Sequence, residues 1–134
     1  MARILVAEDE AAVRAFVTRA LESAGHQVVA VADGGAAVER LMAVGGKDFD
    51  LLLTDIVMPV MDGIALALKA RSLYPDLPIL MMSGYPRERQ RAHNLDLLLT
   101  DILAKPFQLA ELLKAVDAAI DDDSTAGSQG ATDQ

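Results

Sequence analysis

Two alternating hydrophobic periodicities are the feature that most constrains what this chain can fold into. Short apolar runs typical of strands occur at residues 3–7, 26–31, 51–54 and 78–82, and a weaker one occurs at 100–103. Between these runs, apolar residues recur at helical spacing, as Val13, Val17 and Leu21 do. Strands that are apolar throughout are typical of a parallel sheet covered on both faces. The pattern predicts an α/β fold, a doubly wound five-stranded parallel sheet with right-handed crossovers.

The length of 134 residues suits one such domain. Helices are predicted at 63–73 and, more weakly, at 86–93, and a clear helical stripe runs from Leu109 to Ile120. The segment after Ile120 reads Asp-Asp-Asp-Ser-Thr-Ala-Gly-Ser-Gln-Gly, which is too polar to contribute to a core. We expect a folded domain over residues 1–121 and a disordered acidic tail over 122–134.

Composition excludes several classes of function. The chain carries 20 acidic and 12 basic side chains, so it lacks the basic footprint of a general DNA or anionic membrane binder. It has no cysteine and only two histidines, which argues against disulfide frameworks, thiolate catalysis and zinc sites. It shows no secretory signal and no run of the roughly 18 apolar residues that a membrane span needs. We expect a cytoplasmic protein.

Polar residues stand where four of the predicted strands end. Glu8 and Asp9 follow the first strand, Asp55 the third, Ser83 the fourth and Lys105 the fifth. In a flavodoxin-like sheet of order 2-1-3-4-5 these strands are neighbours, and ligands bind beyond their carboxyl ends. The spacing therefore predicts a single site with three carboxylates, a hydroxyl and an ammonium group.

This set of side chains suits phosphoryl transfer. Crowded carboxylates repel one another, and a hard divalent cation such as Mg²⁺ is the usual way to keep them ionised. A carboxylate that attacks phosphorus forms an acyl phosphate. Lys105 and Ser83 would then contact two of the phosphoryl oxygens, and the metal would neutralise a third.

The residues and their spacing resemble those of the receiver domain of two-component response regulators over roughly residues 2–121. The shared motifs are Glu8-Asp9, Asp55, Met58-Pro59, Asp62-Gly63, Ser83-Gly84 and Lys105-Pro106-Phe107. The resemblance implies that Asp55 accepts a phosphoryl group from a histidine kinase or a histidine phosphotransfer protein. It also implies that Asp9 ligates Mg²⁺ with support from Glu8, that Val57 gives the metal its backbone carbonyl, and that Ser83 and Lys105 sense the phosphoryl group.

The runs Ser83-Gly84-Tyr85-Pro86 and Leu103-Ala104-Lys105-Pro106-Phe107 resemble those of stand-alone regulators of the CpdR type and of receivers appended to hybrid kinases. Resemblance to the CpdR type implies that a histidine phosphotransfer protein supplies the phosphate. It also implies that the unphosphorylated form primes the ClpXP protease for particular substrates.

The sequence departs from the family pattern near the predicted switch. Ile102 stands where many receivers carry a switch tyrosine or phenylalanine, so the resemblance does not carry over an aromatic rotamer switch. Val57 and Tyr85 occupy positions where other members often carry polar residues that guide the hydrolytic water. Because these two side chains are less polar, we expect the phosphate to be lost more slowly.

Two partner surfaces are predicted. The outward face of the first helix, with Ala12, Arg14, Ala15 and Thr18, is expected to dock the phosphodonor. A second surface, for an effector or a weak homodimer, is expected around Ile102 and the segment before it, at Tyr85, Arg87, Arg91, Leu95 and Leu98.

The predicted function is a signalling switch that works by protein contact, not an enzyme. A haloacid-dehalogenase-like phosphatase would need a second aspartate where Val57 stands, and a flavodoxin-like phosphate loop would not carry Glu8, Asp9 and Glu10. Two alternatives stay open within the same fold. The chain could be a phosphorelay intermediate or phosphate sink, or a receiver excised from a hybrid histidine kinase.

Overall fold

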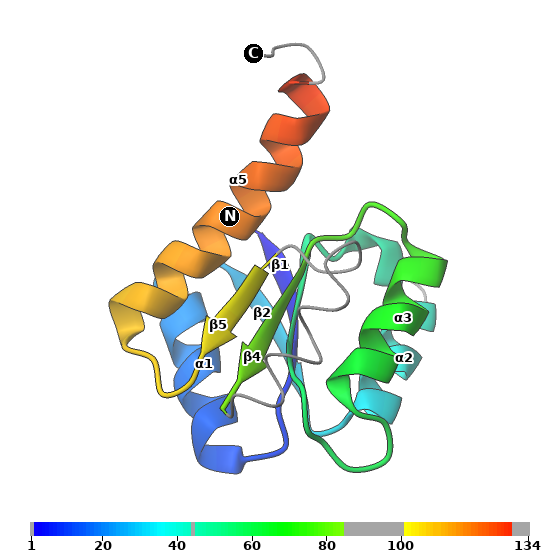
Figure 1. The fold of residues 1–134 in the computed structure, drawn as a ribbon, viewed down its shortest axis with the longest axis vertical. Helices are drawn as coiled ribbons and strands as arrows, with labels where there is room; N and C mark the ends of the chain where they lie inside the picture. The colour runs from blue at the N-terminus through cyan, green and yellow to red at the C-terminus, as the bar shows by residue number, and fades with distance from the viewer. Residues whose placement is uncertain (1, 44, 85–100, 130–134) are drawn as a thin grey trace.

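The computed structural model describes residues 2–43, 45–84 and 101–129, with only the backbone described for residues 46 and 122–129. Five parallel strands form one sheet in the order β2-β1-β3-β4-β5 (Figure 1). They are β1 (Arg3–Ala7), β2 (Gln27–Val31), β3 (Leu51–Asp55), β4 (Ile79–Ser83) and β5 (Asp101–Ala104). The predicted α/β sheet and its strand order are confirmed.

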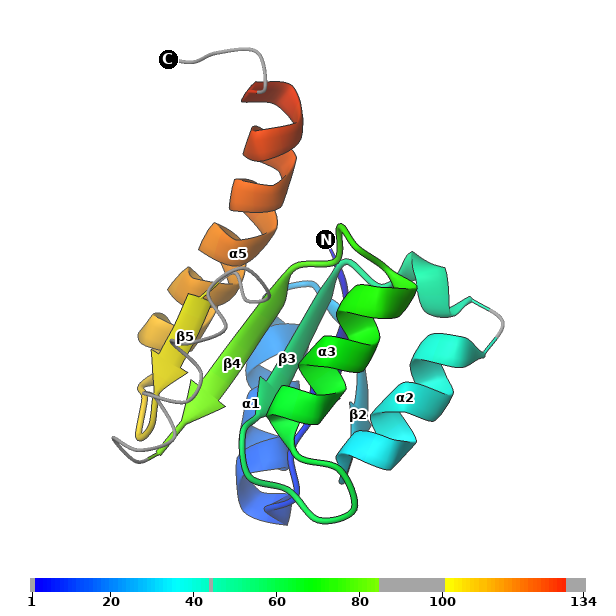
Figure 2. The same cartoon turned by 45° about the vertical axis from the view of Figure 1, so that its right-hand side comes forward.

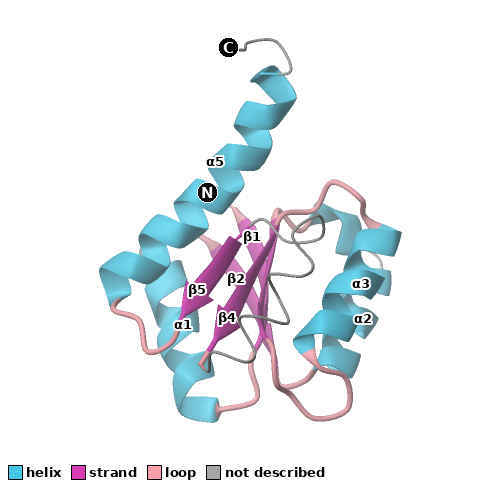
Figure 3. Ribbon diagram, in the orientation of Figure 1, coloured by secondary structure: helices cyan, strands magenta, loops and turns pink. Residues whose placement is uncertain are grey.

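Helices cover both faces of the sheet. On one face lie α1 (Ala11–Ser23) and α5 (Leu109–Gln129), and on the other lie α2 (Gly34–Met42) and α3 (Gly63–Leu73) (Figures 1 and 2). A single 3-10 turn, η1 (Gly46–Asp48), precedes β3 in the described part of the chain. Figure 3 shows the resulting helix–sheet–helix layers. The helix predicted at 86–93 lies outside the described residues.

Alternate residues of each strand supply the two halves of the core. Leu5 and Ala7 of β1 pack toward α2 and α3, whereas Ile4 and Val6 pack toward α1 and α5. Because successive side chains of a strand point to opposite faces, both sets must be apolar when both faces are covered. This requirement is why β1, β3 and β4 appear in the sequence as continuous apolar runs.

Local side chains fix where two of the helices begin. The Asp33 carboxylate accepts a hydrogen bond from the Ala36 amide at 2.7 Å and starts α2, and Asp62 does the same for the Ala65 amide at 2.9 Å at the start of α3. Such N-caps satisfy amides that have no partner within the helix. Glu10 at the start of α1 makes no side-chain cap of this kind.

The last helix continues past the boundary expected from the sequence. α5 runs to Gln129, whereas the hydrophobic stripe ends at Ile120, and Figure 1 shows its last turns projecting beyond the sheet. Once a helix has formed, each further residue costs little because it adds one backbone hydrogen bond. The separate disordered tail over residues 122–134 stays a prediction. None of the helices in the described part of the chain has an apolar stretch long enough to span a bilayer.

The loop between β3 and α3 contains a strained residue. Val60 has a φ of 70°, and it is the only described non-glycine residue with a positive φ. Its side chain is 85% exposed, so little burial repays the strain. The left-handed conformation is costly for a β-branched residue because Cβ approaches the following carbonyl group.

Replacing Val60 with glycine should therefore stabilise the protein. We expect Val60→Gly to raise the free energy of unfolding by about 0.5 to 1 kcal/mol, the relief of strain less the entropy cost of glycine. Val57 lies in the same loop with an ordinary φ and 54% exposure, so Val57→Gly should lower that free energy. Urea denaturation measures both, and shifts of the same sign would contradict the argument.

Candidate functional site

The carboxyl edge of the sheet brings together the polar residues singled out in the sequence. Glu8 follows β1, Asp55 and Ser83 end β3 and β4, and Lys105 follows β5. The Lys105 amide donates to the Ser83 carbonyl at 2.7 Å, so the ends of β4 and β5 are tied together beside the site. Parallel strands necessarily place these ends at one edge.

Three carboxylates converge at this edge. Glu8, Asp9 and Asp55 each offer an oxygen atom, and these atoms all lie within 4.8 Å of one another. Glu8 is fully buried and Asp55 is 7% exposed, whereas Asp9 faces solvent. A donor set made only of carboxylate oxygens suits a hard divalent cation such as Mg²⁺, with Asp9 on the side open to water.

Lys105 lies between the two buried carboxylates. Its Nζ is 2.8 Å from Glu8 Oε1 and 2.9 Å from Asp55 Oδ2. Burial raises the pKa of both carboxyl groups, and the hydrogen bonds from Lys105 only partly offset this effect. Burial alone would lower the pKa of Lys105, but its hydrogen bonds to Glu8 and Asp55 raise it. The site thus holds an ammonium ion that both carboxylates share.

The main chain fixes the position of the Asp55 side chain. Its Oδ1 accepts a hydrogen bond from the Ile56 amide at 2.9 Å, which leaves Oδ2 directed to Lys105. The Gly63 amide donates to the Ile56 carbonyl at 2.6 Å and brings the start of α3 against this segment. A Cβ atom on Gly63 would lie 2.0 Å from the Asp55 carbonyl oxygen, so only glycine fits there.

A groove of about 640 Å³ leads from solvent to Asp55. Its walls are largely apolar, and Phe16 and Phe107 form one side with their ring centroids 6.3 Å apart. We call this the site groove; its lining is Asp9, Glu10, Ala12, Val13, Phe16, Asp55, Val57, Gly84, Lys105, Pro106 and Phe107. The groove therefore gives access from solvent to Asp55 beside α1, past a largely apolar surface.

The remaining predicted residues are placed as follows. Ala12 and Ala15 are exposed on α1, and Arg14 and Thr18 are half-buried. Ile102 is half-buried and packs against the core beneath α2 and α3. The predicted surface at Tyr85, Arg87, Arg91, Leu95 and Leu98 lies outside the described residues.

Sequence reasoning missed two features of the site. Phe16 lies beside the helical stripe of Val13, Val17 and Leu21, and it is 42% exposed and lines the site groove. Arg14 is predicted at a docking face, and its guanidinium also contacts the backbone carbonyls of Glu8 and Asp9. Helical spacing gives the direction of a side chain but not what the neighbouring loops place beside it, so neither contact has a signal in the sequence.

The model of the response regulator receiver domain matches residues 4–117 of this chain. The chain belongs to the response regulator receiver family. Members of this family are signalling domains of two-component systems rather than typical enzymes, and they interact with phosphodonor proteins and with effectors.

Known relatives agree with this assignment. The chain is 41% identical to the response regulator receiver protein CpdR of Brucella abortus over 87% of its own length and 95% of that protein. It is 36% identical to the response regulator MprA of Mycobacterium ulcerans, of which it spans 57%. Among solved structures, the chemotaxis response regulator CheY4 of Vibrio cholerae superimposes with a TM-score of 0.77 at 31% identity, covering 89% of this receiver and 98% of that chain.

The raised pKa of Asp55 leads to a test of stability. A carboxyl group whose pKa is raised by folding favours its neutral form, so its stabilising contribution is complete below the ordinary value of 3.8 and is lost as pH rises. We expect Asp55→Asn to raise the melting temperature at neutral pH without added metal, and the gain to disappear in acid. Thermal unfolding followed by circular dichroism over a pH series measures this.

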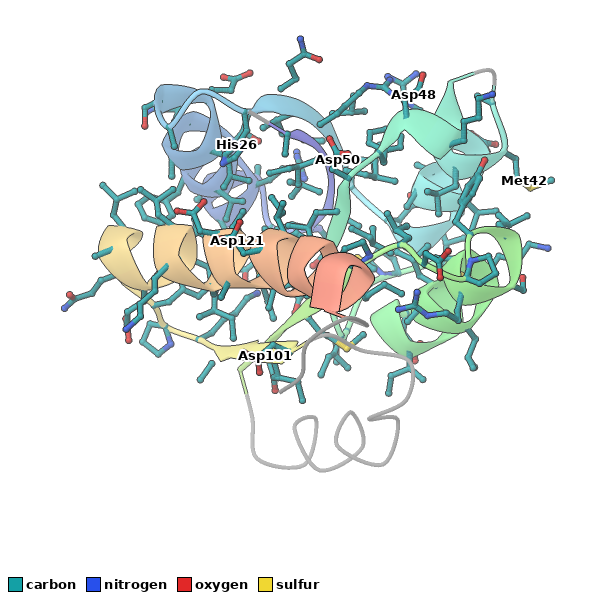
Figure 4. All side chains as sticks on the ribbon, turned by 90° about the horizontal axis from the view of Figure 1, so that it is seen from above. His26, Met42, Asp48, Asp50, Asp101 and Asp121 are labelled. Atoms are coloured by element: carbon teal, nitrogen blue, oxygen red, sulfur yellow. The ribbon has the colours of Figure 1, made fainter. Side chains whose placement is uncertain are left out.

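Asp48→Asn is the matched control. Asp48 is exposed at the opposite end of the sheet, where Figure 4 also shows Asp50 and Asp101 at the starts of β3 and β5. We expect no pH-dependent gain from this substitution. A melting temperature of Asp55→Asn equal to or below that of the wild type at neutral pH would show that the ion pair with Lys105 outweighs the cost of burial.

Proposed function

We propose that this receiver is phosphorylated on Asp55 in a Mg²⁺-dependent phosphorelay and acts through contacts with other proteins. The observation that carries the proposal is the shared ion pair of Lys105 with Glu8 and Asp55 at 2.8 and 2.9 Å. It places a positive charge beside a buried carboxylate at the end of an accessible groove. These are the requirements of an acceptor for a phosphoryl group.

In the proposed reaction an oxygen of Asp55 attacks phosphorus. The bond from phosphorus to the donor histidine nitrogen breaks, and its electron pair stays with the nitrogen, so the product is an acyl phosphate. Glu8, Asp9, Asp55 and the Val57 carbonyl would hold Mg²⁺, whose charge would offset that of the phosphoryl oxygens. Lys105 and the Ser83 hydroxyl would contact the phosphoryl group as it arrives.

Transfer of the phosphoryl group to Asp55 would change the groups that Lys105 can bind. Before the reaction its ammonium group pairs with Glu8 and Asp55. Once Asp55 is phosphorylated, the negative charge lies farther out, on the phosphoryl oxygens, and Lys105 would follow it. Because the Lys105 amide is bonded to the end of β4, this movement would be passed to the adjoining loops.

For the upstream partner, we propose that a histidine phosphotransfer protein or histidine kinase docks over α1. The exposed Ala12 and Ala15 allow close approach, and Ala12 also lines the site groove. For output, the similarity to CpdR over nearly the whole of both chains supports an adaptor role. The ClpXP protease or its substrates are the effectors to test, with Ile102 and the segment before it as the proposed contact surface.

Intact-mass spectrometry after incubation with acetyl phosphate tests the phosphorylation. We expect one phosphoryl adduct on the wild type with Mg²⁺, and none on Asp55→Asn or in the presence of EDTA. Asp62→Asn is the matched control, because Asp62 caps α3 nearby but is not one of the clustered carboxylates, and it should still be modified. An adduct that persists on Asp55→Asn would place the acceptor elsewhere.

A second experiment tests the output. Immobilised ClpXP should retain the unphosphorylated receiver, and addition of acetyl phosphate and Mg²⁺ should reduce the retained fraction for the wild type but not for Asp55→Asn. Equal retention of both states, or none of either, would exclude the adaptor role while leaving the phosphorylation chemistry intact. Return of the phosphate to a histidine phosphotransfer protein would instead favour a relay intermediate.

A further inference from the structure

We propose that Arg14 is a positioning residue that holds the Glu8–Asp9 turn in the geometry needed for metal binding. The inference rests on the proposed function, because it concerns the Mg²⁺ site of that function. Arg14 Nη1 donates to the Glu8 carbonyl at 2.8 Å and, at a longer 3.4 Å, to the Asp9 carbonyl. One guanidinium group thus contacts the backbone of two of the three clustered carboxylate residues.

Arg14 reaches this turn from the side away from the site groove. It lines a shallow hollow of about 300 Å³ with Ala11, Ala15, Thr18, Arg19 and Ala30. None of these residues lines the site groove. Arg14 therefore contacts backbone carbonyls of the turn and not the carboxylate oxygens offered to the metal, so its effect on the metal must pass through the main chain.

The turn has few other restraints among the described residues. The Glu8 amide donates to the Val31 carbonyl at 3.0 Å, and the Glu10 amide donates to Glu8 Oε2 at 2.9 Å. Glu10 provides no side-chain cap for α1, although N-caps stabilise the starts of α2 and α3. The guanidinium of Arg14, one turn into α1, instead ties the helix to the Glu8 and Asp9 carbonyls of the turn.

Two possible effects of Arg14 on Mg²⁺ have opposite signs. As a nearby positive charge, Arg14 would repel the cation, so removing it would tighten binding. As a restraint on the ligands, it would favour binding, because groups behind the ligands of a metal orient them and typically contribute 10- to 100-fold in affinity. We expect the restraint to dominate, since Arg14 contacts carbonyl groups of the turn and its charge is partly open to water.

Isothermal titration with Mg²⁺ alone separates these effects. We expect the dissociation constant to rise roughly tenfold in Arg14→Ala and Arg14→Gln, the lower end of the range for groups behind metal ligands. Arg14→Lys keeps the charge and one donor, so it should fall between these variants and the wild type. Arg19→Ala, an exposed arginine on the same helix, is the matched control and should bind as the wild type does.

The possible results separate the role of Arg14 from the proposed function on which it rests. Failure of the wild type itself to bind Mg²⁺ would overturn the proposed function. Binding by the wild type together with equal or tighter binding by Arg14→Gln would overturn the role of Arg14 alone. Circular dichroism checks that each variant is folded, and if Arg14→Ala is not, the Gln variant decides. Loss of Mg²⁺-induced shifts at the Glu8 and Asp9 amides in NMR spectra would support the role directly.

Discussion

The ion pair that Lys105 makes with Glu8 and Asp55 is the interaction on which the rest of the site depends. Without a cation, two buried carboxylates at this distance would repel each other and favour their neutral forms. The apolar sheet and its covering helices offset the cost of holding this arrangement. The site therefore carries a net negative charge, because three clustered carboxylates face one ammonium group.

Close backbone approach keeps Asp55 in place. Gly63 brings the start of α3 against the Asp55 carbonyl, and Gly34 lets Met61 approach α2 in the same way, since a Cβ there would lie 2.2 Å from the Met61 oxygen. The loop between β3 and α3 is thus held at both helices. The strain at Val60 lies within this loop, where the chain must turn between two fixed contacts.

The fold could be predicted from the sequence because burial on both faces requires every central strand to be apolar. β1 starts and ends as the apolar run indicates, and β2, β3 and β4 do so within a residue. The meeting of Glu8, Asp55 and Lys105 was predictable too, because strand ends share an edge. The sharing of Lys105 between two carboxylates, the exposure of Phe16 and the contacts of Arg14 depend on loop conformations. No periodicity encodes those conformations, and the length of α5 similarly reflects backbone hydrogen bonding rather than a hydrophobic pattern.

Lys105 lies between the buried carboxylates and the edge of the sheet. Lys105 follows β5, which is an edge strand of the sheet and, among the described residues, pairs only with β4. Residues of β5 are exposed or half-buried, in contrast to the fully buried residues of β3 and β4. An edge strand has one neighbour to constrain it, so a shift of its terminal lysine meets less resistance there than at the centre of the sheet. The ion pair of Lys105 with Asp55 thereby links the end of a fully buried strand to the end of an edge strand.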